Sequence, residues 1–126
     1  MTACPFCLIA AGTSVAKDAL VFAVRDTLPV SPGHTLILPK RHIASIFEAT
    51  TEEVADLWEL LRRERAKLLD EFSPDGFNIG INDGLASGQT ILHLHIHLIP
   101  RYKGDMPDPR GGIRWIFPDK AVYWND

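Results

Sequence analysis

The hydrophobic positions near the N-terminus fall into two short runs that predict buried strands. Residues 19–24 are apolar and include β-branched and aromatic side chains, and residues 34–38 form a second run that stops at Pro39. The intervening residues 28–33 contain two prolines and a glycine, which are typical of a turn. We therefore expect two strands joined by a loop.

The middle of the chain has the periodicity of one long helix. Thr50-x-x-Glu53 is a capping box that predicts where the helix begins, and the Pro-Asp-Gly sequence at residues 74–76 predicts that it has ended. Apolar residues at helical spacing share one face, and we expect the whole stripe to pack in the core: Val54, Leu57, Trp58, Leu61, Leu68 and Leu69.

Two alternating segments follow the helix and predict an antiparallel pair of strands. Residues 77–82 and 91–100 alternate between apolar and other side chains, with a glycine-containing loop at residues 83–90 between them. The predicted fold class is α+β, with an antiparallel sheet and one long helix packed across it. Because no repeat or linker interrupts residues 1–126, we expect a single domain with a Pro/Gly-rich tail from about residue 102.

Composition and charge narrow the class of protein. Hydrophobic residues make up 46% of the chain and charged residues 23%, which is ordinary for a globular domain. The net charge of −3 argues against a broad nucleic-acid-binding face. No apolar run approaches the roughly 20 residues that a membrane span needs, and the first residues lack the pattern of a secretory signal. We expect a cytoplasmic protein without a nucleic-acid or membrane partner.

Three histidines alternate with apolar residues at His93, His95 and His97. If this segment is a strand, the three imidazoles point to one face, with neighbours roughly 6.6 Å apart and the outer pair about 13 Å apart, and Leu94, Ile96 and Leu98 point into the core. One tetrahedral zinc ion with bonds near 2 Å hardly takes all three from a straight strand. At least one imidazole is then available for another task.

Two cysteines, Cys4 and Cys7, have Cys-x-x-Cys spacing near the N-terminus. A cytoplasmic location argues against a structural disulfide between them. A redox dithiol and a pair of metal ligands both remain open on spacing alone.

The His-x-His-x-His segment resembles the signature of the histidine triad (HIT) family. Residues 33–40 and 88–90 are similar to other segments of that family in the same order, so that the resemblance runs from Cys4 to about Arg101. It implies a homodimeric α+β fold with a short additional N-terminal helix. It also implies hydrolysis or transfer of nucleoside monophosphates from dinucleoside polyphosphates, phosphoramidates or related small-molecule nucleotides.

The resemblance assigns the chemistry to the second and third histidines of the triad. His95 would attack the α-phosphorus and form a nucleotidyl-histidine intermediate that water cleaves, and His97 would contact the phosphoryl group and assist the leaving group. A neutral imidazole, with an ordinary pKa near 6.5, suits attack on a charged phosphate because it is not repelled. No catalytic metal is required.

Further residues match nucleotide-binding positions of the family. Asp26 would accept hydrogen bonds from the ribose hydroxyls, and His34 would support the active site or contact the nucleotide, although a purely structural histidine is an open alternative. The remaining matches are expected to contact phosphate: Asn82, Gly88, Gln89 and Thr90.

The resemblance also implies a structural zinc site. Several HIT-related enzymes bind zinc with a Cys-x-x-Cys pair and two histidines, which here are Cys4, Cys7, His42 and His93. Two thiolates and two imidazoles form a closed tetrahedral site. The alternative is a family member that kept the cysteines without the metal.

Other functions remain open at this stage. One is a purine nucleoside phosphoramidase, which would use the same phosphoryl site with another leaving group. Another is a nucleotide-binding or scaffold protein with incidental catalysis, and a third is a hydrolase that uses the triad as metal ligands. By the same resemblance, Trp124 in the tail could reach the site of a second subunit.

Overall fold

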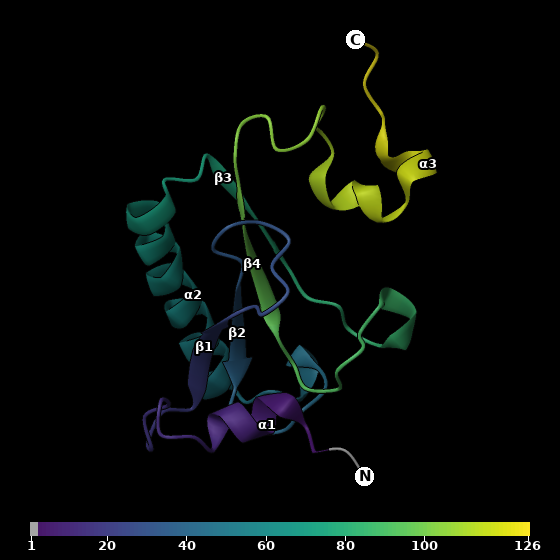
Figure 1. Ribbon diagram of the computed structural model, residues 1–126. Helices are drawn as coiled ribbons and strands as arrows, with labels where there is room; N and C mark the ends of the chain where they lie inside the picture. The colour runs from purple at the N-terminus through teal and green to yellow at the C-terminus, as the bar shows by residue number, and fades with distance from the viewer. Residues whose placement is uncertain (1–2) are drawn as a thin grey trace.

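The computed structural model describes residues 3–126 and confirms the α+β class. Four strands form one antiparallel sheet in the order β1-β2-β4-β3 (Figure 1). The strands are β1 (Val21–Arg25), β2 (Thr35–Pro39), β3 (Gly76–Gly80) and β4 (Ile96–Arg101). The helices are α1 (Pro5–Ala10), α2 (Thr51–Phe72) and α3 (Pro118–Ala121), with short 3-10 turns η1 (Ile46–Glu48), η2 (Leu85–Ser87) and η3 (Gly112–Ile116). Residues 1 and 2 of the predicted N-terminal segment lie outside the described residues.

The turn between β1 and β2 depends on Gly33. This glycine has a φ of 90°, in the region that side chains with a Cβ rarely adopt, and an added Cβ would lie 2.9 Å from the Leu68 side chain. The strands on either side pair with Arg25 opposite Thr35. Close approach of this turn to α2 therefore fixes where His34 enters the sheet.

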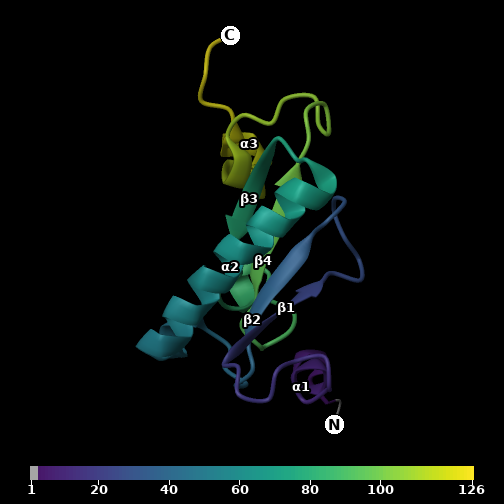
Figure 2. The same cartoon turned by 90° about the vertical axis from the view of Figure 1, so that its left-hand side faces the viewer.

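Helix α2 lies across one face of the sheet (Figure 2). Leu57, Leu61 and Leu68 are buried in a core that also contains residues of β2 and β4. The prediction that the whole stripe is buried was wrong for Trp58 and Leu69, which are 51% and 38% exposed. Each follows a buried leucine directly and is rotated from it by about 100° around the helix axis. Among the described helices, none has the length and apolar character needed to cross a membrane.

Strand β4 is shorter than predicted, because it begins at Ile96 rather than at residue 91. The β2–β4 register pairs Ile37 with Ile96, so its continuation would set Leu94 opposite Pro39. A proline has no N–H to donate to a ladder, and Leu94 N–H instead donates to the Ile43 carbonyl at 2.6 Å. The predicted burial of the apolar residues that alternate with the histidines is nevertheless confirmed, since Leu94, Ile96 and Leu98 are all 0% exposed.

The capping box at the start of α2 is confirmed and carries an ion pair. Thr50 N–H donates to Glu53 Oε1 at 2.8 Å, Glu53 N–H donates to Thr50 Oγ1 at 3.0 Å, and the Arg41 guanidinium donates to both carboxylate oxygens of Glu53. Glu53 is buried. The hydrogen bond from Arg41 is the main cause that lowers the pKa of Glu53 from 4.5 to about 2.

We expect Glu53→Gln to lower the free energy of unfolding by about 2 kcal/mol at pH 7, a value reduced because Arg41 is half exposed. The folded pKa is lowered, so the carboxylate's contribution is complete above about pH 4.5 and is lost as the pH falls toward 2. Urea unfolding from pH 7 to pH 2.5 checks this, since the variant should lose the slope in that window. Glu59→Gln, which removes an exposed pair with Arg62, is the control and should change unfolding far less.

Candidate active site and metal centre

His95 lies just before β4 with its two ring nitrogens in different environments. Its Nδ1 is 2.8 Å from the backbone carbonyl of His93. A carbonyl oxygen can only accept, so Nδ1 carries the hydrogen and Nε2 of the neutral ring keeps its lone pair. Among the described residues, none hydrogen-bonds this Nε2. In its neutral form the half-buried ring therefore presents the Nε2 lone pair as the nucleophilic position.

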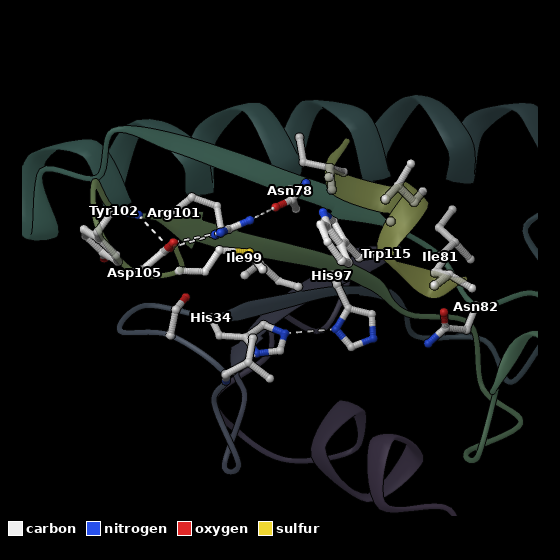
Figure 3. Close-up of a pocket in the computed structure, with 18 of the residues that line it drawn as sticks. His34, Asn78, Ile81, Asn82, His97, Ile99, Arg101, Tyr102, Asp105 and Trp115 are labelled. Carbon is white, nitrogen blue, oxygen red and sulfur yellow. Dashed lines mark hydrogen bonds and ion pairs between the residues drawn. The ribbon is translucent and has the colours of Figure 1, made fainter. Parts of the chain in front are cut away.

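A second hydrogen-bonded chain fixes the tautomer of His97. Val30 N–H donates to His34 Nδ1 at 3.2 Å, so His34 carries its hydrogen on Nε2. That Nε2 lies 2.9 Å from Nδ1 of His97 and donates to it (Figure 3). The hydrogen of neutral His97 is then on its own Nε2. The rings of His95 and His97 are 5.1 Å apart between centroids, which places an N–H donor beside the nucleophilic nitrogen's ring.

Burial keeps the two bonded histidines neutral. Removal from water is the main cause that lowers the pKa of His97 to about 4, and neighbouring His95 and His34 lower it further. Burial also lowers the pKa of His34, partly opposed by the Asp26 carboxylate. At neutral pH both rings therefore remain uncharged, as the chain of hydrogen bonds requires.

Asp26 lies where β1 ends, beside His34. Its Oδ1 accepts from Leu28 N–H at 3.0 Å, and its Oδ2 is 3.6 Å from His34 Nε2. Ligand atoms of Asp26, His34 and His97 all lie within 4.8 Å of one another, a grouping that could geometrically hold a cation. Because the hydrogen of His34 Nε2 already occupies the space between the two imidazoles, His34 and His97 are hydrogen-bonded to each other instead, with the Asp26 carboxylate beside them.

Gln89, in the loop before the triad, was expected to contact phosphate through its side chain, but the structure places that side chain elsewhere. This side chain is buried, its amide nitrogen donates to the carbonyls of Ala44 and Ile91, and its oxygen accepts from Gly84 N–H. The backbone N–H groups of Gly88 and Gln89 are likewise bonded within the η2 turn. Gly88 has a φ of 94°, which suits glycine. Gln89 therefore holds the loop in shape, and of the three predicted loop contacts Thr90 is the one whose side chain is exposed.

Asn82 lines a cavity of about 630 Å³ together with His34 and His97. The cavity is also lined by residues that sequence reasoning did not assign to the site, including Arg101, Tyr102 and Trp115 (Figure 3). The only sequence signal for Trp115 is the aromatic content of the tail, which does not indicate where the tail packs.

Phe6 is another residue that sequence reasoning missed. It is buried, and its ring centroid lies 5.1 Å from that of His95 and 5.8 Å from that of His93. Since it lies between Cys4 and Cys7 in α1, it connects the cysteine pair physically to the nucleophilic ring.

The four predicted metal ligands come together. Nδ1 of His93 is 3.5 Å from both Cys4 Sγ and Cys7 Sγ, and Nδ1 of His42 is 3.2 Å from Cys7 Sγ and from His93 Nδ1. A tetrahedral zinc ion with bonds of 2.0–2.3 Å separates its ligand atoms by about 3.3–3.8 Å. Nε2 of His93 donates to the Pro39 carbonyl at 2.8 Å, which turns Nδ1 toward the thiols. The donor set therefore fits zinc.

Comparison with known proteins decides the family. A family profile described as "HIT domain" matches residues 10–104, which is most of the chain. The chain belongs to the HIT family. The resemblance drawn from the histidine segment and the predicted α+β fold are thereby both confirmed.

Two relatives and one solved structure illustrate the membership of this HIT chain. "Protein hit" of Bacillus subtilis is 40% identical over 107 residues, covering 81% of this chain and 74% of that protein. The "Bis(5'-adenosyl)-triphosphatase" of Dictyostelium discoideum is 43% identical over 86 residues, covering 68% of this chain and only 58% of that protein. The crystal structure of a zinc-bound histidine triad family protein from Mycobacterium smegmatis has a TM-score of 0.72 and 34% identity, covering 83% of this chain and 84% of that one.

Proposed function

We propose that this HIT protein is a nucleotidyl hydrolase or transferase that works through a covalent intermediate on His95. Nε2 of His95 attacks the α-phosphorus of a nucleoside 5′-phosphate derivative, an N–P bond forms, and the bond from phosphorus to the leaving group breaks. Water then cleaves the N–P bond and releases the nucleoside monophosphate. The observation that carries the proposal is the hydrogen bond from His95 Nδ1 to the His93 carbonyl, which leaves the lone pair on Nε2.

His97 supplies a hydrogen bond to the leaving group in this proposal. Its Nε2–H, fixed by the chain from Val30 N–H through His34, donates a hydrogen bond to the departing atom and stabilises the negative charge that develops there. His34 acts through His97 and is a positioning residue. This assigns the two active-site imidazoles opposite roles, because Nε2 of His95 carries a lone pair and acts as the nucleophile, whereas Nε2 of His97 carries a hydrogen and acts as a hydrogen-bond donor.

The proposed contacts with the substrate are made by other residues of the same site. Oδ2 of Asp26 accepts from the ribose hydroxyls, and Asn82 and Thr90 donate to phosphoryl oxygens. Gly88 and Gln89 shape the loop that carries Thr90. Dinucleoside polyphosphates are supported as substrates by relatives named as a triphosphatase and a tetraphosphatase, and a phosphoramidate is the alternative with the same first step.

Two structural features complete the proposal. Cys4, Cys7, His42 and His93 would hold a structural zinc ion, supported by their spacing and by the zinc-bound relative from Mycobacterium smegmatis. The protein would act as a homodimer. This expectation is consistent with the position of β3 at an edge of the sheet, where the apolar side chain of Ile79 is 43% exposed.

Trapping the intermediate tests the function directly. The protein is mixed with an adenosine 5′-phosphate derivative labelled on the α-phosphate, quenched at alkaline pH where phosphohistidine bonds survive, and digested. We expect a labelled nucleotide on the peptide that contains the triad, with fragmentation placing it on His95. Turnover without any trapped adduct, or an adduct on another histidine, would contradict the proposal.

A further inference from the structure

The turn between β1 and β2, residues 28–33, sets the direction of a hydrogen bond in the candidate active site. A hydrogen bond between two neutral imidazoles can run either way. Because Val30 N–H donates to His34 Nδ1 at 3.2 Å, His34 donates to His97, and the hydrogen of His97 is on Nε2. In the reverse direction, Nδ1 of His34 would carry a hydrogen that points at Val30 N–H, and Nε2 of His97 would carry a lone pair. The position of one backbone N–H therefore selects whether His97 is a donor.

The turn buries little apolar surface that could hold Val30 in place. The side chains of Leu28 and Val30 are 85% and 72% exposed. Exposed segments with few buried apolar contacts are the ones that open most easily in folded proteins. Other contacts must therefore fix the Val30 N–H beside the His34 ring.

Two hydrogen bonds join the turn to the end of β4, and we call them the tethers. Ser31 Oγ donates to the Pro100 carbonyl at 2.8 Å, and the Tyr102 hydroxyl donates to the Pro32 carbonyl at 2.7 Å. Both are made within two residues of Val30. Since β4 also carries the third histidine of the triad, the tethers fix the turn relative to the strand whose imidazole it controls.

The backbone of Tyr102 is fixed as well. Its N–H donates to Asp105 Oδ2 at 3.0 Å, and the same carboxylate accepts two hydrogen bonds of 2.7 Å from Arg101 (Figure 3). Arg101 also donates to Asn78 Oδ1, on β3, at 2.7 Å. The Tyr102 side chain therefore extends from a backbone that is held against the sheet, which gives its hydroxyl a defined position.

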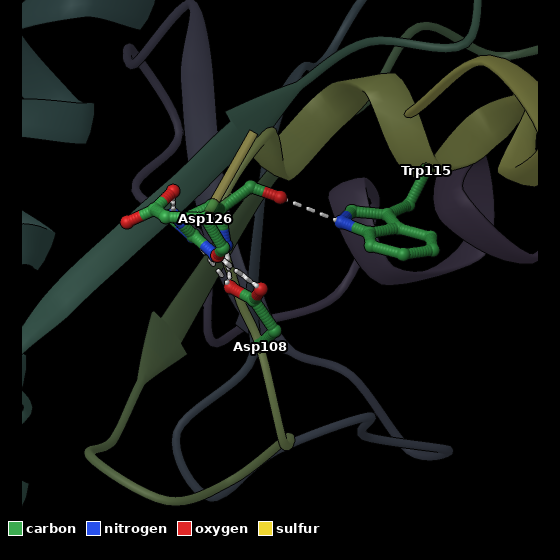
Figure 4. Close-up of polar contacts among 4 residues, drawn as sticks. Asp108, Trp115 and Asp126 are labelled. Atoms are coloured by element: carbon green, nitrogen blue, oxygen red, sulfur yellow. Dashed lines mark hydrogen bonds and ion pairs between the residues drawn. The ribbon is translucent and has the colours of Figure 1, made fainter. Parts of the chain in front are cut away.

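The C-terminal segment that follows has contacts of its own. Arg110 forms ion pairs with Asp108 and Asp126, and its carbonyl accepts from Trp115 Nε1 at 2.8 Å (Figure 4). None of these contacts involves the Tyr102 hydroxyl. We therefore expect loss of that hydroxyl to act on the turn rather than on the segment.

We propose that Tyr102 and Ser31 are positioning residues of the active site. Through the tethers they hold the Val30 N–H, which sets the direction of the hydrogen bond between His34 and His97. The inference rests on the proposed function, in which the Nε2–H of His97 stabilises the negative charge on the departing atom. Without a tether, part of the molecules adopts the reverse direction and loses this donor.

Kinetics with two leaving groups of similar shape tests the proposal. Adenosine 5′-phosphate is esterified with phenol in one substrate and with 4-nitrophenol in the other, and phenolate depends more on a donor because it is the more basic. We expect Tyr102→Phe to lower kcat/KM roughly tenfold for the phenyl ester and less than about twofold for the nitrophenyl ester. Ser31→Ala should show the same dependence. The control is Tyr123→Phe, in a 69% exposed tyrosine outside the cavity lining, which should change neither value.

Nitrogen-15 NMR of the histidine rings measures the tautomer without turnover. In the wild-type protein we expect the hydrogen of His34 on Nε2 and a lone pair on Nδ1. In Tyr102→Phe the two ring nitrogens should shift toward values for a mixture of both tautomers, whereas Tyr123→Phe should keep the wild-type spectrum. Thermal unfolding checks that each variant is folded.

The outcomes separate a positioning role from a merely structural one. An equal loss of kcat/KM with both esters, or no loss with either, would overturn the proposal. A His34 tautomer that is unchanged in both Tyr102→Phe and Ser31→Ala would overturn it as well. Absence of turnover and of a His95 adduct with both esters would instead reject the proposed function, and the NMR spectra would still decide whether the tethers control the tautomer.

Discussion

Replacement of His95 by alanine is expected to reduce turnover of an adenosine 5′-phosphate substrate by roughly four to six orders of magnitude. The substitution removes the attacking nitrogen, and loss of a nucleophile in a covalent mechanism leaves only the rate supplied by binding and by the remaining polar groups. Single-turnover kinetics with the labelled substrate measures the effect. No nucleotide adduct should accumulate on the variant.

Binding of the product should survive the same substitution. The proposed contacts of Asp26, Asn82 and Thr90 with AMP do not involve His95, so the dissociation constant measured by calorimetry should change only a few-fold. Thermal unfolding serves as the check that the variant is folded. If His95→Ala kept more than about 1% of the wild-type rate, another group would be the nucleophile. If the variant performed the protein's cellular role normally, a binding or scaffold function would be favoured.

Local patterns predicted the fold where the physical cause is itself local. The Thr50 and Glu53 capping box marks the start of α2 because both hydrogen bonds are made within four residues. The alternation at Leu94, Ile96 and Leu98 predicted burial even though β4 begins only at Ile96. An extended backbone alternates its side chains whether or not a neighbouring strand bonds to it.

Partners distant in the sequence explain what the patterns could not predict. His93 was expected on a strand, but its ring and the adjacent Leu94 N–H bond to the carbonyls of Pro39 and Ile43, more than 50 residues away. The buried amide of Gln89 must satisfy its hydrogen bonds inside the protein, so it cannot remain available to phosphate. Neither fact can be derived from the residue's own neighbours in the chain.

The residues of the candidate site divide in the same way, into those that the sequence pattern indicates and those that contacts distant in the sequence position. Residue type and spacing drew attention to the three histidines and the cysteine pair, because imidazoles and thiols are rare and chemically distinctive. The family resemblance then assigned roles to His95 and His97 and completed the set of metal ligands with His42 and His93. The pocket depends on Trp115, which hydrogen bonds of the C-terminal segment bring opposite the sheet. A tryptophan in a Pro/Gly-rich tail carries no pattern that indicates such a position.

Loss of the metal centre is expected to have the largest effect on stability. Purified protein should contain about one zinc per chain, and Cys7→Ser should lower both the zinc content and the melting temperature, the latter by about 10 °C or more. The physical reason is that the four ligands come from three separate segments, namely α1, the chain after β2 and the chain before β4. Zinc would tie these segments together, and without it the thiols and imidazoles have only weak hydrogen bonds to one another.

Loss of zinc would also affect the packing of the active site, because Phe6 of α1 packs on the His95 ring. Removal of zinc from the wild-type protein with a chelator should lower its melting temperature in the same way. Added zinc should restore the original melting temperature of the wild-type protein but should not raise that of Cys7→Ser. Cys4→Ser should behave like Cys7→Ser, since both thiols lie at the same distance from His93 Nδ1. A zinc-free protein whose melting temperature responds to a reductant instead would identify Cys4 and Cys7 as a redox pair. An unaltered melting temperature in both variants would show that the cluster contributes nothing to the fold.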